Sequence, residues 1–289
     1  MWIIYALLTA FFFATSDALT KWALRSRNEY FIAWMRLVSA VPVLVISLFL
    51  IEIPTLDKTF WIATLIALPL EVIAIILYTK ALKSSPLTLT MPFLSFTPIF
   101  LIIVSYLMLG ERVSLQGAIG ILLIAIGSYI LNIHTVGRSL IEPLRLIIKE
   151  RGSIMMMAVA FIFSLTSSLG KMAIVHSSPI FFGSLYFILL TIIFTPIAMI
   201  ANRERLSISR GDVVSLIPIG LTYSLMIIFH MIAMSRANVA YMISVKRMSI
   251  FFSILYGHIL FKEERIGQRA FGALLMFMGF VLIVLSRGS

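Results

Sequence analysis

The chain has 289 residues, of which 61% are hydrophobic and only 12% are charged, and its mean hydropathy is +1.08. Soluble domains carry about a quarter charged residues, so this composition excludes a soluble globular domain and indicates a membrane protein. The net charge of +11 does not indicate a nucleic-acid partner, because the Lys and Arg residues lie in short segments between apolar runs.

The first apolar run, residues 2–20, lacks the basic start and the small-residue cleavage site of a signal peptide, so we expect it to remain as a membrane span. Nine further runs follow, each near the roughly 20 residues that a helix needs to cross a hydrocarbon core of ~30 Å. They show no two-residue alternation, which predicts helices rather than a barrel. The ten predicted spans lie at 2–20, 30–50, 60–82, 87–109, 113–132, 153–175, 180–200, 213–236, 239–261 and 266–286.

The second half of the chain repeats the first. We therefore predict an all-α membrane protein with ten transmembrane helices in two five-helix repeats, residues 1–132 and 153–289, joined by a loop at 133–152 that can form an interfacial helix. Because five is odd, the second repeat should enter the membrane from the opposite side, an inverted arrangement typical of secondary transporters. The matched residues are Leu19, Lys21 and Ala23 with Leu169, Lys171 and Ala173, and Glu111, Gln116, Gly120 and Gly127 with Glu263, Gln268, Gly272 and Gly279.

Two segments carry a family resemblance, LMLGERVSLQGAIGILLIAIGSYIL and ILFKEERIGQRAFGALLMFMGFVLIVL. They resemble the fourth-to-fifth and ninth-to-tenth helix segments of EamA-type members of the drug/metabolite transporter superfamily, in which an L-G-E-like turn precedes a helix with Gln and Gly. The resemblance covers essentially the whole chain. It implies a ten-helix carrier of small metabolites, often an exporter of amino acids or related compounds, with a central cavity between the repeats.

The distribution of basic residues predicts an orientation in the cell (inner or plasma) membrane. Most Lys and Arg residues outside the spans lie in the odd-numbered loops, so the positive-inside rule places these loops in the cytoplasm and both termini outside it. The family resemblance implies the reverse, with both termini inside. The even-numbered loops and the C-terminus hold Lys58, Arg112, Lys171, Arg236 and Arg287.

Lys246 and Arg247 stand side by side in ISVKRMSI, within the otherwise apolar span 239–261. A rise of 1.5 Å per residue places them roughly 10 to 12 Å into the hydrocarbon core, where each charge costs at least about 2.5 to 3.5 kcal/mol. Three interpretations are open: a buried structural ion pair, a cavity wall that receives an anionic group, or a span whose bounds differ from the predicted ones. The first repeat has Leu94 and Ser95 at the matching positions, so the charges are not part of the shared scaffold, which favours substrate binding.

Glu71 is the predicted partner of these cations, because it lies near the middle of the span 60–82 and so near the bilayer midplane. We expect it to act as their counter-ion or as a proton-coupling carboxylate, since a carboxylate in apolar surroundings can titrate when a nearby cation is displaced. Tyr223, which matches Glu71 in the second repeat, and Tyr78 are expected to be secondary substrate contacts.

Asp17, Lys21 and Arg36 form a shallower set of charges. Asp17 and Lys21 are four residues apart on one helical face and could pair locally, whereas Lys21 could instead extend to the membrane surface. Arg36 either extends to the surface in the same way or lines the cavity as a substrate contact.

We therefore expect a secondary active transporter that moves a small polar, anionic or zwitterionic metabolite, such as an amino acid or a related compound, by alternating access. A lipid or lipid-linked sugar flippase is the alternative. The sequence contains no Cys, no paired-His metal motif, no glycine-rich phosphate loop and no nucleophile elbow, so we expect no enzyme, metal or cofactor. The expected partners are the substrate, the lipid bilayer and protons as coupling ions.

Overall fold

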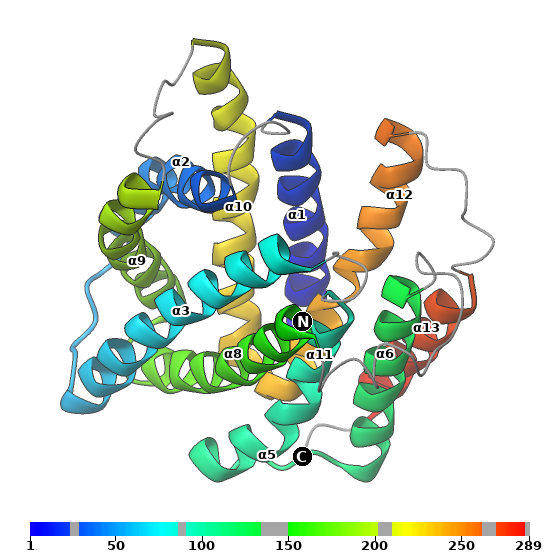
Figure 1. Ribbon diagram of the computed structural model, residues 1–289. Coiled ribbons are helices and arrows are strands. Elements are labelled where there is room, and N and C mark those ends of the chain that lie inside the picture. Colours follow the sequence, from blue (N-terminus) through cyan, green and yellow to red (C-terminus); the bar gives the residue numbers. More distant parts are fainter. Residues whose placement is uncertain (24–28, 86–90, 134–149, 202–209, 262–269, 287–289) are drawn as a thin grey trace.

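The computed structural model describes residues 1–23, 29–85, 91–133, 150–201, 210–261 and 270–286, and the regular secondary structure of these residues is entirely helical (Figure 1). A helix occupies each of the ten predicted apolar runs. Most of the predicted loop at 133–152, with its expected interfacial helix, lies outside the described residues. The helices are α1 (Trp2–Ala23), α2 (Glu29–Phe49), α3 (Lys58–Ser84), the 3₁₀ helix η1 (Met91–Phe96), α5 (Thr97–Leu109), α6 (Leu115–Ile133), α8 (Arg151–Val175), α9 (Pro179–Ala201), α10 (Arg210–Arg236), α11 (Val239–Lys246), α12 (Ser249–Phe261) and α13 (Ala270–Leu285).

Seven helical segments in the described part of the chain are long and apolar enough to cross a membrane, and α6 and α13 are shorter apolar helices. Large apolar side chains cover their outer faces, among them Leu65 (61% exposed), Ile103 (62%) and Phe271 (59%). A soluble protein rarely exposes so much apolar surface, whereas lipid tails accept it at no cost. The outer surface is therefore suited to lipid.

The most extensive helix contacts join the two halves of the chain. α3 packs against α8 and α1 against α10, and each pair joins the third helix of one half to the first helix of the other. α2 packs against α9 and α6 against α13, which pairs the second helices and the last helices of the two halves. Each half therefore completes its core with helices from the other half.

α6 and α13 lie side by side at one edge of the molecule and run antiparallel (Figure 1). Gly120, near the start of α6, faces the carbonyl of Gly279, near the end of α13, and Gly127 faces the carbonyl of Gly272. A side chain on any of these four glycines would collide with the backbone of the opposite helix. Small residues at such positions let two helix backbones approach closely.

Candidate functional site

The predicted span 239–261 is interrupted at its two charged residues. α11 ends at Lys246, and α12 begins only at Ser249. Between them the backbone tightens, because the amide of Met248 donates to the carbonyl of Val245, three residues back, at 2.9 Å. The prediction of a single continuous helix was wrong here. Inside a membrane such a break is tolerated only where protein or water surrounds the freed backbone groups.

The predicted span 87–109 departs from α-helical geometry at the matching place. η1 ends at Phe96, and α5 begins at Thr97 with Pro98 in its first turn. Pro98 has no N–H and therefore cannot donate to the carbonyl of Leu94, four residues back. The described part of this span is one helical run from Pro92 to Leu109. Its first part is 3₁₀ rather than α-helical, and the proline supplies the physical reason.

Arg247 connects the two breaks. Its Nη2 donates to the carbonyl oxygen of Leu94 at 2.7 Å and to Oγ1 of Thr97 at 3.1 Å. A side chain from the second half thus supplies the hydrogen bond that Pro98 cannot make. The Nε of Arg247 is buried and has no hydrogen-bond partner among the described residues. This arginine therefore fixes the two broken helices to each other at the centre of the molecule.

Lys246 lies against α1, with its Nζ 5.2 Å from the ring centroid of Phe13. Glu71 lies beside Thr166 of α8 and within electrostatic range of Lys246. Among the described side chains, no ion pair within 4.0 Å joins Glu71 to Lys246 or Arg247. The expected direct counter-ion contact is thus not formed, although the carboxylate and the lysine share the same interior.

Arg36 of α2 faces the interior rather than the membrane surface. Its Nη1 donates to Oδ1 of Asp17 at 2.5 Å. Its guanidinium carbon lies 4.5 Å from the ring centroid of Tyr223 and 5.6 Å from that of Phe13. Asp17 thus pairs with α2, and the side chain of Lys21, its other predicted partner, lies outside the described residues.

The predicted site residues therefore converge from five helices: α1, α2, α3, α10 and α11. Tyr78 belongs to this group, since it lies within electrostatic range of Arg36 and Arg247. Across the group, three cations face two carboxylates, so the interior carries a positive excess. The residues are Asp17, Arg36, Glu71, Tyr78, Tyr223, Lys246 and Arg247.

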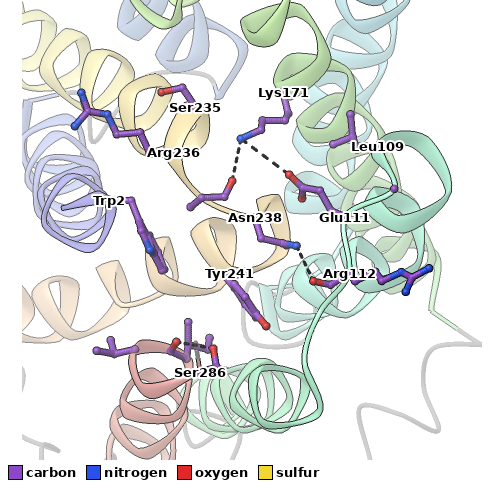
Figure 2. Close-up of a pocket in the computed structure, with 14 residues that line it drawn as sticks. Trp2, Leu109, Glu111, Arg112, Lys171, Ser235, Arg236, Asn238, Tyr241 and Ser286 are labelled. Carbon is purple, nitrogen blue, oxygen red and sulfur yellow. Dashed lines mark hydrogen bonds and ion pairs between the residues drawn. The ribbon is translucent and has the colours of Figure 1, made fainter. Parts of the chain in front are cut away.

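A cavity of about 710 Å³ opens at the end of the bundle where α11 begins (Figure 2). None of the predicted site residues lines it. Asn238 caps α11 at this cavity by accepting a hydrogen bond from the amide of Ala240 at 3.0 Å, and Lys246 is the last residue of the same short helix. At 1.5 Å per residue, α11 spans only about 12 Å between the cavity and the buried charges. The cavity residues include Trp2, Glu111, Arg112, Lys171, Arg236, Asn238, Tyr241 and Ser286.

Lys171 and Glu111 join four elements beside this cavity. Lys171 of α8 donates to the carbonyls of Met234 at 2.5 Å and Ala237 at 3.0 Å, at the end of α10. Its Nζ lies 4.0 Å from Oε1 of Glu111 (Figure 2). Glu111 in turn accepts a hydrogen bond from the amide of Val239, at the start of α11, at 2.8 Å. The sequence repeat contains both residues, since Lys171 matches Lys21 and Glu111 matches Glu263, but we did not predict either of them as a functional residue.

The ionisation of Glu111, which lies between α5 and α6, should affect stability. Burial raises the pKa of Glu111, and the hydrogen bond from Val239 and the charge of Lys171 offset this only in part. Because the folded protein then holds this proton more tightly than the unfolded chain, the contribution of Glu111 to stability is fully present below its ordinary pKa of about 4.3 and is lost as the pH rises through the raised pKa. We expect Glu111→Gln to flatten this fall in melting temperature. The same slope in the variant and the wild type would assign the titration to another group.

Comparison with known proteins identifies the chain. The model of the EamA-like transporter family matches it twice, over residues 1–133 and 150–285. The chain belongs to the EamA-like transporter family. It is therefore a multi-pass membrane transporter of the drug/metabolite transporter superfamily, and the family resemblance predicted from the sequence is confirmed.

The fold has a solved counterpart. A structure described as "Crystal structure of protein" aligns with a TM-score of 0.78 and 14% identity, covering 98% of this chain and 97% of that chain. At this identity the likeness concerns the fold alone. No curated protein matches the chain.

Proposed function

We propose that this EamA protein is a secondary active transporter that carries a small anionic or zwitterionic metabolite through a midplane site by alternating access. The observation that carries the proposal is the pair of helix breaks, one in each half, that meet through the hydrogen bond between Arg247 and Leu94. Broken helices at a repeat interface are the usual substrate sites of such transporters, because they present backbone groups and charges to a ligand. Counterflow and uptake assays in proteoliposomes test it.

The packing of the last helices supports an inverted arrangement of ten transmembrane helices. The sequence repeat matches Gly120 with Gly272 and Gly127 with Gly279, whereas the contacts pair Gly120 with Gly279 and Gly127 with Gly272. This exchange is expected when a two-fold axis passes between two antiparallel equivalent helices. Equivalent helices that run antiparallel are what oppositely inserted repeats require.

The charges of the interior support an anionic group on the substrate. Three cations and two carboxylates in an apolar bundle leave a positive excess, which a bound anion would offset where screening by water is weak. We assign Lys246 as the main contact, with Arg36, Tyr223 and Tyr78 around it and Arg247 holding the helix breaks in place. Glu71 or Asp17 would carry a coupling proton. None of the contacts among the described residues specifically favours a lipid substrate.

The orientation remains a proposal based on the loop charges, with both termini outside the cytoplasm. The cavity beside Lys171 would then open to the outside, because it lies at the end of the bundle that holds Trp2 and Ser286. We expect a C-terminal alkaline phosphatase fusion to be active and a green fluorescent fusion to be dark. The opposite pattern would reverse the orientation and leave the fold unaffected.

A further inference from the structure

The guanidinium of Arg36 uses only part of its hydrogen-bonding capacity. Nη1 binds Asp17, whereas Nε and Nη2 are both buried and have no hydrogen-bond partner among the described residues. Leaving buried donors unpaired costs about 1 to 3 kcal/mol per group, and more for a charged group, so native proteins keep few of them. Two on one side chain therefore leave an edge of the guanidinium to which a bound molecule can offer acceptor atoms.

The two unpaired atoms lie on the same edge of the guanidinium. Nε and Nη2 carry parallel N–H bonds, the geometry that receives both oxygens of a carboxylate at once. Asp17 occupies the opposite nitrogen and fixes the rotation of the group. The accepting group must therefore lie close to the guanidinium plane.

Aromatic rings limit the shape of that group. The guanidinium carbon lies 4.5 Å from the ring centroid of Tyr223 and 5.6 Å from that of Phe13. The face of an aromatic ring is electronegative, so a tetrahedral anion such as phosphate, whose remaining oxygens project out of the plane, would meet repulsion. A planar carboxylate avoids it.

The ion pair of Arg36 and Asp17 is partly exposed at its carboxylate end, whereas the unpaired edge of Arg36 is buried. The Asp17 side chain is 40% exposed, compared with 18% for Arg36. Lys246 lies against the same Phe13 ring, at 5.2 Å from its centroid. One small molecule could thus contact both cations.

We propose that the Nε and Nη2 edge of Arg36 binds a carboxylate of the transported substrate, with Asp17 as a positioning residue. This inference rests on the proposed transport function and gives it a substrate class: carboxylic acids, including amino acids, in preference to phosphate or phosphonate compounds. Lys246 then contacts a second polar group of the same molecule.

The first test uses the full-length protein and pairs of ligands that differ only at the acid group. Thermal unfolding is followed with L-alanine and L-alaninamide, L-aspartate and L-aspartic diamide, succinate and succinamide, and benzoate and benzamide, with methylphosphonate as the tetrahedral anion. We expect at least one acid to raise the melting temperature, and its amide and methylphosphonate to have little effect, because a bound ligand stabilises the folded state. Equal shifts with acid and amide, a preference for methylphosphonate, or no shift with any acid would contradict the proposal.

The second test uses Arg36→Lys, which keeps the charge but removes the two-bond edge. We expect the dissociation constant of the stabilising acid to rise about tenfold or more. Arg151→Lys, at the exposed start of α8, is the matched control and should bind like the wild type. Wild-type binding by a folded Arg36→Lys would overturn the assignment. If Arg36→Lys does not fold, the acid and amide pairs with wild type decide the question.

These results separate the site from the transport function. Acids that bind through Arg36 but do not enter proteoliposomes would contradict transport and leave the carboxylate site standing. Uptake that is equally efficient with Arg36→Lys would contradict the carboxylate site and leave transport standing.

Discussion

Lys246→Met is expected to abolish uptake of an anionic substrate into proteoliposomes while the protein remains folded. Lys246 forms no ion pair within 4.0 Å among the described side chains, so the change leaves no directly paired carboxylate behind. It also removes the cost of an intramembrane charge, about 2.5 to 3.5 kcal/mol, so the melting temperature should stay level or rise. The substrate loses a cation in a medium where Coulomb attraction is only weakly screened. Uptake and melting temperature are measured on the same preparation.

Arg247→Met is the informative comparison, because it removes the neighbouring charge together with structural hydrogen bonds. The carbonyl of Leu94 would keep the hydrogen bond from Oγ1 of Thr97 at 2.8 Å but lose the charged donor at 2.7 Å. Since both variants remove one intramembrane charge, we expect Arg247→Met to be less stable than Lys246→Met by about 1 to 3 kcal/mol. The two variants should therefore both lose transport but differ in stability: Lys246→Met is as stable as the wild type or more stable, and Arg247→Met is the less stable of the two variants. Normal uptake by a folded Lys246→Met protein would remove this lysine from the substrate site.

Glu71→Gln in the same assay examines proton coupling. If Glu71 carries the coupling proton, its amide should flatten the pH dependence of uptake more than it changes the melting temperature. Since no direct ion pair joins Glu71 to a cation in the described structure, a large loss of stability would indicate instead that the carboxylate is structural.

The helices were predictable because length and hydrophobicity determine them almost alone in a membrane. The two helix interruptions differ in whether the local sequence predicts them. Pro98 lies inside the predicted span 87–109 and is a local signal that could have located the first break. No proline lies between Lys246 and Ser249, so the second break depends on contacts with the other half, which no local pattern reveals.

The charged residues of the interior were predictable, but their partners were not. Depth in the membrane placed Glu71 near Lys246, yet depth does not say which side of a helix a residue occupies. Asp17 pairs with Arg36, a partner that the sequence did not suggest, because α1 and α2 turn these side chains toward each other. Pairing between helices depends on rotation and crossing angle, which are set by packing across the whole bundle.

The glycine contacts between α6 and α13 predict the largest effect on stability. A Cβ atom on Gly127 would lie 2.5 Å from the carbonyl oxygen of Gly272, and one on Gly279 would lie 2.5 Å from that of Gly120. Backbone atoms cannot yield as a flexible side chain can, so the helices would have to separate. We expect Gly127→Ala and Gly279→Ala each to cost about 1 to 3 kcal/mol. The double variant should cost less than the sum, because both changes push the same two helices apart.

Gly170→Ala is the matched control, because a Cβ there would meet only the Phe182 ring at 3.4 Å. Alanine is the better helix former by about 1 kcal/mol, so this variant should be as stable as the wild type or more stable. Reversible unfolding in mixed micelles with increasing SDS measures the wild type and all four variants. If Gly127→Ala and Gly279→Ala unfold at the same SDS fraction as Gly170→Ala, the close approach of α6 and α13 does not hold. The contacts of Gly120 with Gly279 and of Gly127 with Gly272 would then no longer support an inverted repeat, since the inverted arrangement was inferred from these pairs.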